Sequence, residues 1–226
     1  MLYLSAVFPA MEQSGPAYTE DGFELTFGTN HLGPFYLTLL LLETLKKTTP
    51  SRIVMVSSAL HDPNTMKYKD YQQPHLDFDN LQLLQPGTYS SWTAYGNSKL
   101  GNVLFTKELS RKLQGCDVTV NSLCPGWIPS TGLSRSNPWY VKCFILCCCR
   151  CLCRCNGLTT SLSRGSACVT YVATNQTLHE VTGEYFNDCQ IVESSEESND
   201  INVAKQLWDA SITLLELEKE TYEKLW

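Results

Sequence analysis

The sequence predicts a single α/β domain over residues 1–226, in which a mostly parallel sheet has helices on both faces. Short runs rich in β-branched residues alternate with long helical patterns, and this alternation is typical of parallel strands joined by right-handed helical crossovers. The chain has 226 residues, of which 43% are hydrophobic, and this is enough apolar material for one substantial core. We therefore expect one three-layer unit rather than two domains.

The first half of the chain predicts two strands and two helices. A strand-like stretch at 1–8 precedes a helical pattern at 19–47, which begins with Glu20 and Asp21 and ends with Lys46 and Lys47. Acidic residues at the start of a helix and basic residues at its end suit the helix dipole. A buried strand at 51–58, a polar connector at 61–90 and a helix at 91–114 follow, and Gly115 predicts the end of that helix.

The second half continues the alternation. A strand at 118–123 runs into the turn Pro125-Gly126. We then expect an apolar helical region at 139–152, a helix at 164–174, a short strand at 184–186 and a final helix at 201–225. The acidic segment at 193–200 is predicted to be a solvated loop before the last helix.

Charge and hydropathy narrow the classes of partner and location. The net charge of −6 gives no basic surface suited to nucleic acid, so we expect no such partner. Residues 1–11 lack the basic start of a signal peptide, and the apolar run at 35–42 is too short to cross a membrane. We therefore expect a cytoplasmic protein. The four histidines show no metal-ligand spacing, and we assign them no chemistry: His31, His61, His75 and His179.

One tyrosine stands out among the eleven in the chain. Tyr95 alone has a lysine four residues later, Lys99, and residues four apart share a helix face. Because a nearby cation favours phenolate over phenol, we expect Lys99 to lower the pKa of Tyr95 from its usual value near ~10. Such a tyrosine can exchange a proton near neutral pH. The spacing alone is common on helices, so its meaning depends on the surrounding residues.

Three further stretches accompany this pair in a fixed order. Asn30 lies in the first helical pattern, Ser57 and Ser58 end the strand at 51–58, and Pro125-Gly126 follows the next strand. An amide, a hydroxyl at a strand end, a Tyr/Lys pair and a Pro-Gly turn in this order resemble the short-chain dehydrogenase/reductase family. The following stretches are similar to the retinol dehydrogenases and to the oxidoreductase domain of WW domain-containing oxidoreductase: 19–24, 30–33, 52–58, 94–100, 104–109, 183–186 and 207–208.

The resemblance implies a hydride-transfer site that uses NAD or NADP. Tyr95 would be the general acid/base, Lys99 would lower its pKa and reach the ribose hydroxyls, and Asn30 would hold a water in a proton relay behind Lys99. Ser58, rather than Ser57, would hydrogen-bond the reacting oxygen and stabilise its developing charge. The resemblance also implies cofactor contacts for these residues: Tyr95, Lys99, Pro125, Gly126, Ile128 and Thr131.

The chain departs from the family pattern in its first part. Family members begin with a strand, a glycine-rich turn and a helix N-terminus that holds the pyrophosphate. None of the thirteen glycines follows a strand with that spacing, and the stretch at 1–8 corresponds to the family's fourth strand. We therefore expect an N-terminally truncated, partial Rossmann-type sandwich that lacks the first three strands and their helices. Its first strand would present an apolar edge open to self-association.

Cysteines form a second unusual feature. Seven of the eleven lie at 143–155, inside an apolar segment at 137–157 that the resemblance implies is a flap over the substrate. Two interpretations stay open: a simple apolar lid, or an interfacial segment at 139–155 that is reversibly palmitoylated and contacts an intracellular membrane. A metal cluster is disfavoured because paired C-x-x-C motifs and nearby histidines are missing. The others are predicted to be small core residues: Cys116, Cys124, Cys168 and Cys189.

Two functions from different classes are consistent with these observations. The first is an NAD(P)-dependent oxidoreductase that acts on an apolar alcohol or carbonyl, such as a retinoid or steroid. The second is a catalytically silent interaction or regulatory protein, which the missing phosphate cradle favours. The sequence decides neither the choice between NAD and NADP nor the substrate.

Overall fold

The computed structural model describes residues 2–4, 15–65, 73–128, 159–218, 222 and 224–226. Its centre is a sheet in the order β1-β2-β3-β4-β5. Four strands run parallel, and the short β5 is antiparallel to β4. The prediction of an α/β fold with a mostly parallel sheet is confirmed. The strands are β1 (Leu2–Leu4), β2 (Ser51–Val56), β3 (Val118–Cys124), β4 (Tyr185–Asn187) and β5 (Gln190–Ile191).

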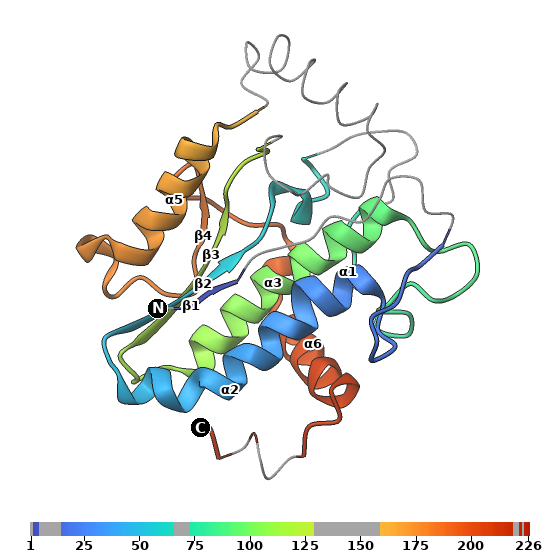
Figure 1. The fold of residues 1–226 in the computed structure, drawn as a ribbon, viewed down its shortest axis with the longest axis horizontal. Coiled ribbons are helices and arrows are strands. Elements are labelled where there is room, and N and C mark those ends of the chain that lie inside the picture. Colours follow the sequence, from blue (N-terminus) through green and yellow to red (C-terminus); the bar gives the residue numbers. More distant parts are fainter. Residues whose placement is uncertain (1, 5–14, 66–72, 129–158, 219–221, 223) are drawn as a thin grey trace.

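Helices cover both faces of this sheet (Figure 1). The helix α5 (Leu162–Thr174) lies on one face, whereas α2 (Gly33–Lys47) and α3 (Ser91–Lys112) lie on the other, with α6 (Ile201–Leu214) packed against α3. The parallel register of β2 and β3 brings their carboxyl ends to the same edge of the sheet. The segments that follow these two strands therefore leave the sheet close together, and the amide of Ala59 reaches the sulfur of Cys124.

The first long helix begins later than predicted. Gly22 has a φ of 85°, which a helix cannot contain, and the carboxylate of Glu24 accepts the amides of Thr26 and Phe27 at 2.9 and 2.6 Å. Glu24 is therefore the N-cap, and the predicted start at residue 19 is wrong. The helical run then continues through α1 (Leu25–Phe27), a π-helical turn (Gly28–Leu32) and α2.

The last helix ends well before the predicted residue 225. Glu216 has a φ of 49°, and the amides of Glu216 and Leu217 bond back to the carbonyls of Thr213 and Ile212 at 3.1 Å each. This is the Schellman pattern that ends many helices, here without the usual glycine. Of the strand predicted at 1–8, only Leu2–Leu4 lies within the described residues. The other boundaries differ little from the prediction, except that β5 was not predicted.

The acidic segment before α6 is not a simple solvated loop, so that prediction is wrong. Ser194, Ser195 and Ser198 are buried there, and the Glu197 carboxylate accepts the amide of Leu76 at 3.0 Å. Asp200 caps α6 by accepting the amide of Asn202 at 2.7 Å. The carboxylates of the segment thus satisfy backbone amides that would otherwise lack partners.

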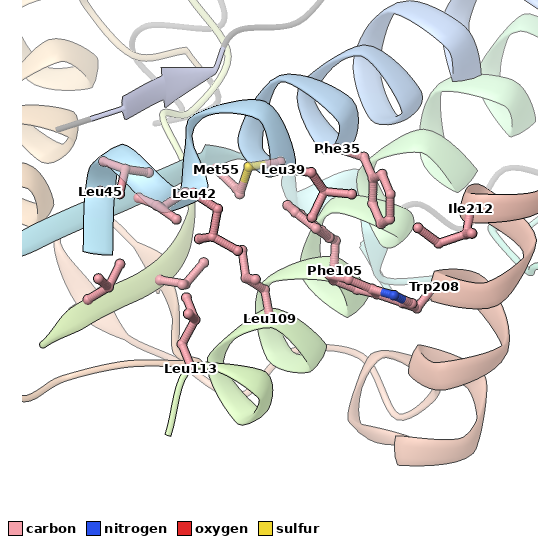
Figure 2. Close-up of a cluster of buried hydrophobic side chains, with 13 residues drawn as sticks. Phe35, Leu39, Leu42, Leu45, Met55, Phe105, Leu109, Leu113, Trp208 and Ile212 are labelled. Carbon is pink, nitrogen blue, oxygen red and sulfur yellow. The ribbon is translucent and has the colours of Figure 1, made fainter. Parts of the chain in front are cut away.

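The main core lies between the sheet and the three helices on one face (Figure 2). Figure 2 shows side chains of α2, α3 and α6 meeting above β2. The Trp208 indole is stacked on the Phe105 ring, and the two ring centroids are 5.7 Å apart. The Phe35 ring meets both. The cluster consists of Phe35, Leu39, Leu42, Leu45, Ile53, Met55, Phe105, Leu109, Leu113, Val118, Val120, Trp208 and Ile212.

Several predicted features lie outside the described residues. They are the cysteine-rich segment at 137–157, the helical region at 139–152 and Thr131. Among the helices that the structure describes, none combines the length and the apolar character needed to span a bilayer. Cys124 and Cys168 are buried as predicted, whereas Cys116 is exposed and Cys189 is half-buried, so the prediction of core positions is wrong for the last two.

Candidate active site

Lys99 is fully buried in the middle of α3, at the carboxyl ends of β2 and β3. Its ammonium donates to the carbonyl of Val56, the last residue of β2, at 3.0 Å. The Ser57 hydroxyl in turn donates to the carbonyl of Lys99 at 2.8 Å. Burial lowers the pKa of Lys99 to about 7 because a charged amine loses its hydration there. The protein thus holds a lysine that changes charge near neutral pH.

Tyr95 lies one helical turn before Lys99 and is also buried. The ammonium of Lys99 lies 5.4 Å from the centre of the tyrosine ring, so the expected neighbours are together. The pKa of Tyr95 is nevertheless raised, chiefly by burial, while a hydrogen bond with the Ser58 side chain acts in the opposite direction. The predicted lowering of this pKa is therefore wrong for this arrangement, because the ammonium is directed to the Val56 carbonyl and burial outweighs the favourable contact.

Ser57 and Ser58 take different positions after β2. The Ser57 side chain is turned into α3, where it holds the helix backbone. Ser58 has extended backbone angles, and its hydroxyl accepts the amide of Leu60 at 3.2 Å and contacts Tyr95. The structure therefore brings Ser58, and not Ser57, to the tyrosine side chain.

Asn30 reaches the same helix from the π-helical turn, and it is fully buried. Its amide nitrogen donates to the Ser98 hydroxyl at 3.1 Å, and that hydroxyl donates to the Tyr95 carbonyl at 2.8 Å. Single π turns inside α-helices are frequent at functional sites. Asn30 is thus connected to Tyr95 through Ser98, whereas its predicted role in a water relay remains a prediction.

The loop after β3 is packed tightly against the start of α5. Gly126 has a φ of 79°, and a Cβ there would lie 2.2 Å from the Thr160 hydroxyl oxygen. A Cβ at Gly165 would lie 2.3 Å from the Ile128 side chain and 2.9 Å from the Pro125 carbonyl. Both glycines are required by these close approaches. The predicted cofactor residues Pro125, Gly126 and Ile128 therefore form one fixed loop at the carboxyl end of β3.

His61 holds the backbone of Ser58, although no role was predicted for this histidine. Its Nε2 accepts the amide of Ser195 at 3.2 Å, so Nδ1 carries the proton and donates to the Ser58 carbonyl at 2.7 Å. Burial lowers the pKa of His61 and keeps it neutral at neutral pH. The spacing of three residues from Ser58 was visible in the sequence, but the partner at Ser195 was not.

Cys124 is a second residue that sequence reasoning missed. Its sulfur accepts the amides of Ala59 and Gly126 at 3.3 and 3.4 Å, and it contacts the Tyr185 hydroxyl. Burial raises the pKa of Tyr185, and the ring packs against His61 at a centroid distance of 4.6 Å. This sulfur therefore joins the loops after β2 and β3.

A buried polar chain runs from Lys99 toward α6. Asn102 donates to the same Val56 carbonyl as Lys99, at 3.2 Å, and it also contacts His31. The Nε2 atom of His31 lies 2.9 Å from the Ser211 hydroxyl. Because that hydroxyl donates to the Leu207 carbonyl, His31 must be the donor. Burial lowers the pKa of His31 to about 4, so this imidazole stays neutral at neutral pH.

Comparison with known proteins connects this arrangement to a family. No family model matches the chain. It is 42% identical over 205 residues to retinol dehydrogenase 14 of Homo sapiens and 41% identical over 200 residues to retinol dehydrogenase 13 of Homo sapiens, covering 89% and 88% of this chain. The chain is a homologue of the retinol dehydrogenases. It belongs with them to the predicted short-chain dehydrogenase/reductase family.

Two further matches extend this result. WW domain-containing oxidoreductase of Gallus gallus is 38% identical over 200 residues. The crystal structure of an uncharacterized protein from Mycobacterium paratuberculosis superposes on this chain with a TM-score of 0.63 and 29% sequence identity. The superposition includes 90% of this chain and 63% of the mycobacterial chain. The chain spans about half the length of the curated relatives it matches, 55% and 56% of the two human proteins.

The described residues fit one end of a dinucleotide. Lys99, Tyr95 and Ser58 gather at the carboxyl ends of the strands, where open α/β sheets bind such ligands, and the ammonium has three donors, of which Val56 takes one. A pyrophosphate is usually held where a helix follows a strand through a glycine-rich turn, and none of the described helices has this arrangement. The helix N-termini at Leu25 and Ile201 are occupied by the carboxylates of Glu24 and Asp200, which repel phosphate. The fit is therefore confined to the nicotinamide and ribose end.

Proposed function

We propose that this chain carries the catalytic part of an NAD(P)-dependent oxidoreductase that acts on an apolar alcohol or carbonyl. The observation that supports this most directly is the grouping of Ser58, Tyr95 and Lys99 at the carboxyl ends of β2 and β3. It occurs in a homologue of the retinol dehydrogenases. A bound nicotinamide would supply the hydride chemistry.

In this proposal Tyr95 transfers the proton and Ser58 orients the reacting oxygen. Because burial raises the pKa of Tyr95, the phenol is protonated at neutral pH and is ready to donate to a carbonyl that is being reduced. The Ser58 hydroxyl, already in contact with Tyr95, stabilises the charge that develops on the same oxygen. Oxidation of an alcohol requires the phenolate, so its rate is expected to rise with pH.

The proposed apolar substrate is supported by the surroundings of the site. Trp127 follows Gly126 in the loop after β3 and is 44% exposed, which offers an indole face next to the candidate residues. The relatives are named for retinol, an apolar alcohol. An apolar side chain of this size contributes to binding mainly by burial of its area.

A second function is favoured by the poor fit of the phosphate end. If the chain cannot hold the phosphates, for which the described residues offer no cradle, it would act as a silent interaction protein. β1 lies at one end of the described sheet, paired only with β2 there. Such an edge offers backbone groups to another strand. In this case the partner would be a second copy of the chain or a full-length relative.

Cofactor binding separates the two functions. NADH and NADPH are titrated separately into the purified chain, and tryptophan fluorescence is followed together with energy transfer to the reduced nicotinamide. Binding at micromolar cofactor would support the oxidoreductase and contradict the silent protein. The absence of binding at millimolar cofactor would contradict the oxidoreductase.

Matched variants locate the binding site and the chemistry. Lys99→Met should abolish cofactor binding, whereas Lys47→Met on the surface of α2 should leave it unchanged. Tyr95→Phe should keep the binding and remove at least about a hundredfold of the retinaldehyde reductase activity, in the range expected for loss of a general acid. The surface variant Tyr36→Phe serves as its control.

A further inference from the structure

Cys168 and Cys189 bring two thiols together from separate elements. Cys168 lies in the middle of α5 and is 3% exposed, whereas the half-buried Cys189 lies in the turn between β4 and β5. The amide of Cys189 donates to the Cys168 sulfur at 3.1 Å, and the side chain of Cys189 also lies close enough to affect the pKa of the Cys168 thiol. These residues contact one another although they are 21 positions apart in the sequence.

The turn that carries Cys189 has an unusual backbone. β4 and β5 pair through Asn187 and Gln190, so the loop contains only Asp188 and Cys189, with φ angles of 49° and 62°. Two positive φ angles in a two-residue loop indicate a type I′ turn, whose second position favours glycine. The chain places a cysteine there instead, and the side chain and amide of this cysteine are both directed to Cys168.

An ion pair holds this turn against α5. Arg164, in the first turn of α5, donates from Nε and Nη2 to the two carboxylate oxygens of Asp188 at 3.0 and 2.6 Å. A two-point contact of this kind fixes orientation as well as distance. The residue next to Cys189 is thus attached to the helix that contains Cys168, which keeps the two sulfurs in register.

We propose that Cys168 and Cys189 form a reversible disulfide in the presence of a small disulfide oxidant such as glutathione disulfide. The thiolate of the more accessible Cys189 attacks one sulfur of the oxidant and releases one molecule of glutathione. The Cys168 thiol then loses its proton to solvent and attacks the Cys189 sulfur, which releases the second glutathione. The two protein thiols lose two electrons and two protons in total, and the oxidant gains them as two thiols.

The position of the bridge gives it a structural effect. The start of α5 packs on the loop after β3, through Gly165 with Ile128 and through the Thr160 amide, which donates to the Trp127 carbonyl at 2.7 Å. A covalent bond between α5 and the β4–β5 turn would therefore restrain the helix on which this loop rests. The inference does not depend on the proposed function, because neither cysteine belongs to the candidate catalytic residues.

The test uses the full chain equilibrated in mixtures of reduced and oxidised glutathione. Remaining thiols are alkylated, and peptides are mapped by mass spectrometry without reduction. The expected result is a Cys168–Cys189 bridge whose fraction rises to near completion with oxidation and falls again with dithiothreitol. Exposed Cys116 serves as the internal control and should acquire only glutathione. A Cys189 bridge to the cysteines at 143–155, or glutathione on Cys189 without closure, would overturn the proposal.

Two variants guard against a folding artefact. Cys189→Gly places the preferred residue at the left-handed position, so this variant should fold, and its Cys168 should stay reduced under conditions that bridge the parent chain. Cys168→Ser should convert the bridge into a mixed disulfide on Cys189. The oxidised parent should also melt at a higher temperature than its reduced form; equal melting temperatures with a complete bridge would contradict the predicted restraint of α5.

Discussion

Replacement of Lys99 by methionine is expected to stabilise the fold while it removes the group proposed to hold the cofactor. Burial moves the pKa of this lysine from 10.5 to about 7. Each pKa unit corresponds to about 1.4 kcal/mol, so keeping the proton on the buried amine costs on the order of 5 kcal/mol relative to the unfolded chain. Methionine is apolar and similar in length, so it avoids this cost.

The variant also loses one interaction. The Val56 carbonyl would keep the hydrogen bond from Asn102 at 3.2 Å, so the loss of the Lys99 contact should cost only about 1 kcal/mol. The expected net gain in the free energy of unfolding is therefore about 2–4 kcal/mol at mildly acidic pH. Most substitutions of a fully buried residue destabilise the fold, so a gain in the free energy of unfolding for Lys99→Met is a sharp test of this reasoning.

The pH dependence of the stability difference shows whether it arises from the buried charge of Lys99. Below about pH 7 the lysine is protonated in both states, and the full cost is present. Between about pH 7 and 10.5 the unfolded chain still binds the proton while the folded chain does not, so the stability of the parent rises with pH. The advantage of Lys99→Met should therefore shrink steadily across this range.

Urea unfolding of the parent chain and of Lys99→Met, followed by circular dichroism at several pH values, measures this difference. Lys47→Met, at an exposed position, should change stability by less than about 0.5 kcal/mol at every pH. A Lys99→Met variant that is less stable than the parent at about pH 6 would refute the reasoning, and so would a gain that does not change with pH.

Three further predictions concern the same region. Burial lowers the His31 pKa from 6.5 to about 4, so the chain should lose about 3 kcal/mol of stability as pH falls between these values; in His31→Gln, acid titration of urea midpoints should show a flatter slope. Gly126→Ala should lower the free energy of unfolding by about 2–4 kcal/mol, because of the positive φ and the contact with Thr160. Gly22→Ala, which has open space around it, should lower it by only about 1–2 kcal/mol in the same urea unfolding experiment. Leu109→Ala, in the centre of the main core, should cost about 2–5 kcal/mol in chemical unfolding, and a loss below about 1 kcal/mol would contradict the packing described.

Local patterns predicted the parts of the site that depend on one element. The spacing of Tyr95 and Lys99 placed both on one face of α3, and the polar end of the strand at 51–58 placed Ser58 at the edge of the sheet. Helix ends were harder to predict where capping was unusual. Glu24 caps a helix that Glu20 and Asp21 were expected to start, and Glu216 takes a left-handed conformation that ordinarily indicates glycine.

The contacts between distant segments could not be predicted from local patterns. His61 depends on the amide of Ser195, and the sulfur of Cys124 acquires its role only when two strands are aligned. The pKa of Tyr95 was mispredicted for the same reason, because burial is a property of the assembled fold. A lysine at the right spacing does not by itself decide the direction of that shift.

The two supporting histidines have a consequence for the order in which the chain is synthesised. Residues up to 128 contain every described candidate catalytic and cofactor residue, yet the partners of His61 and His31 are Ser195 and Ser211. In a nascent chain that has emerged only through β3, the Nε2 atoms of both imidazoles would lack their partners in the interior, which is costly. The ribosome must therefore deliver the last third of the protein before the catalytic region can settle into its final form.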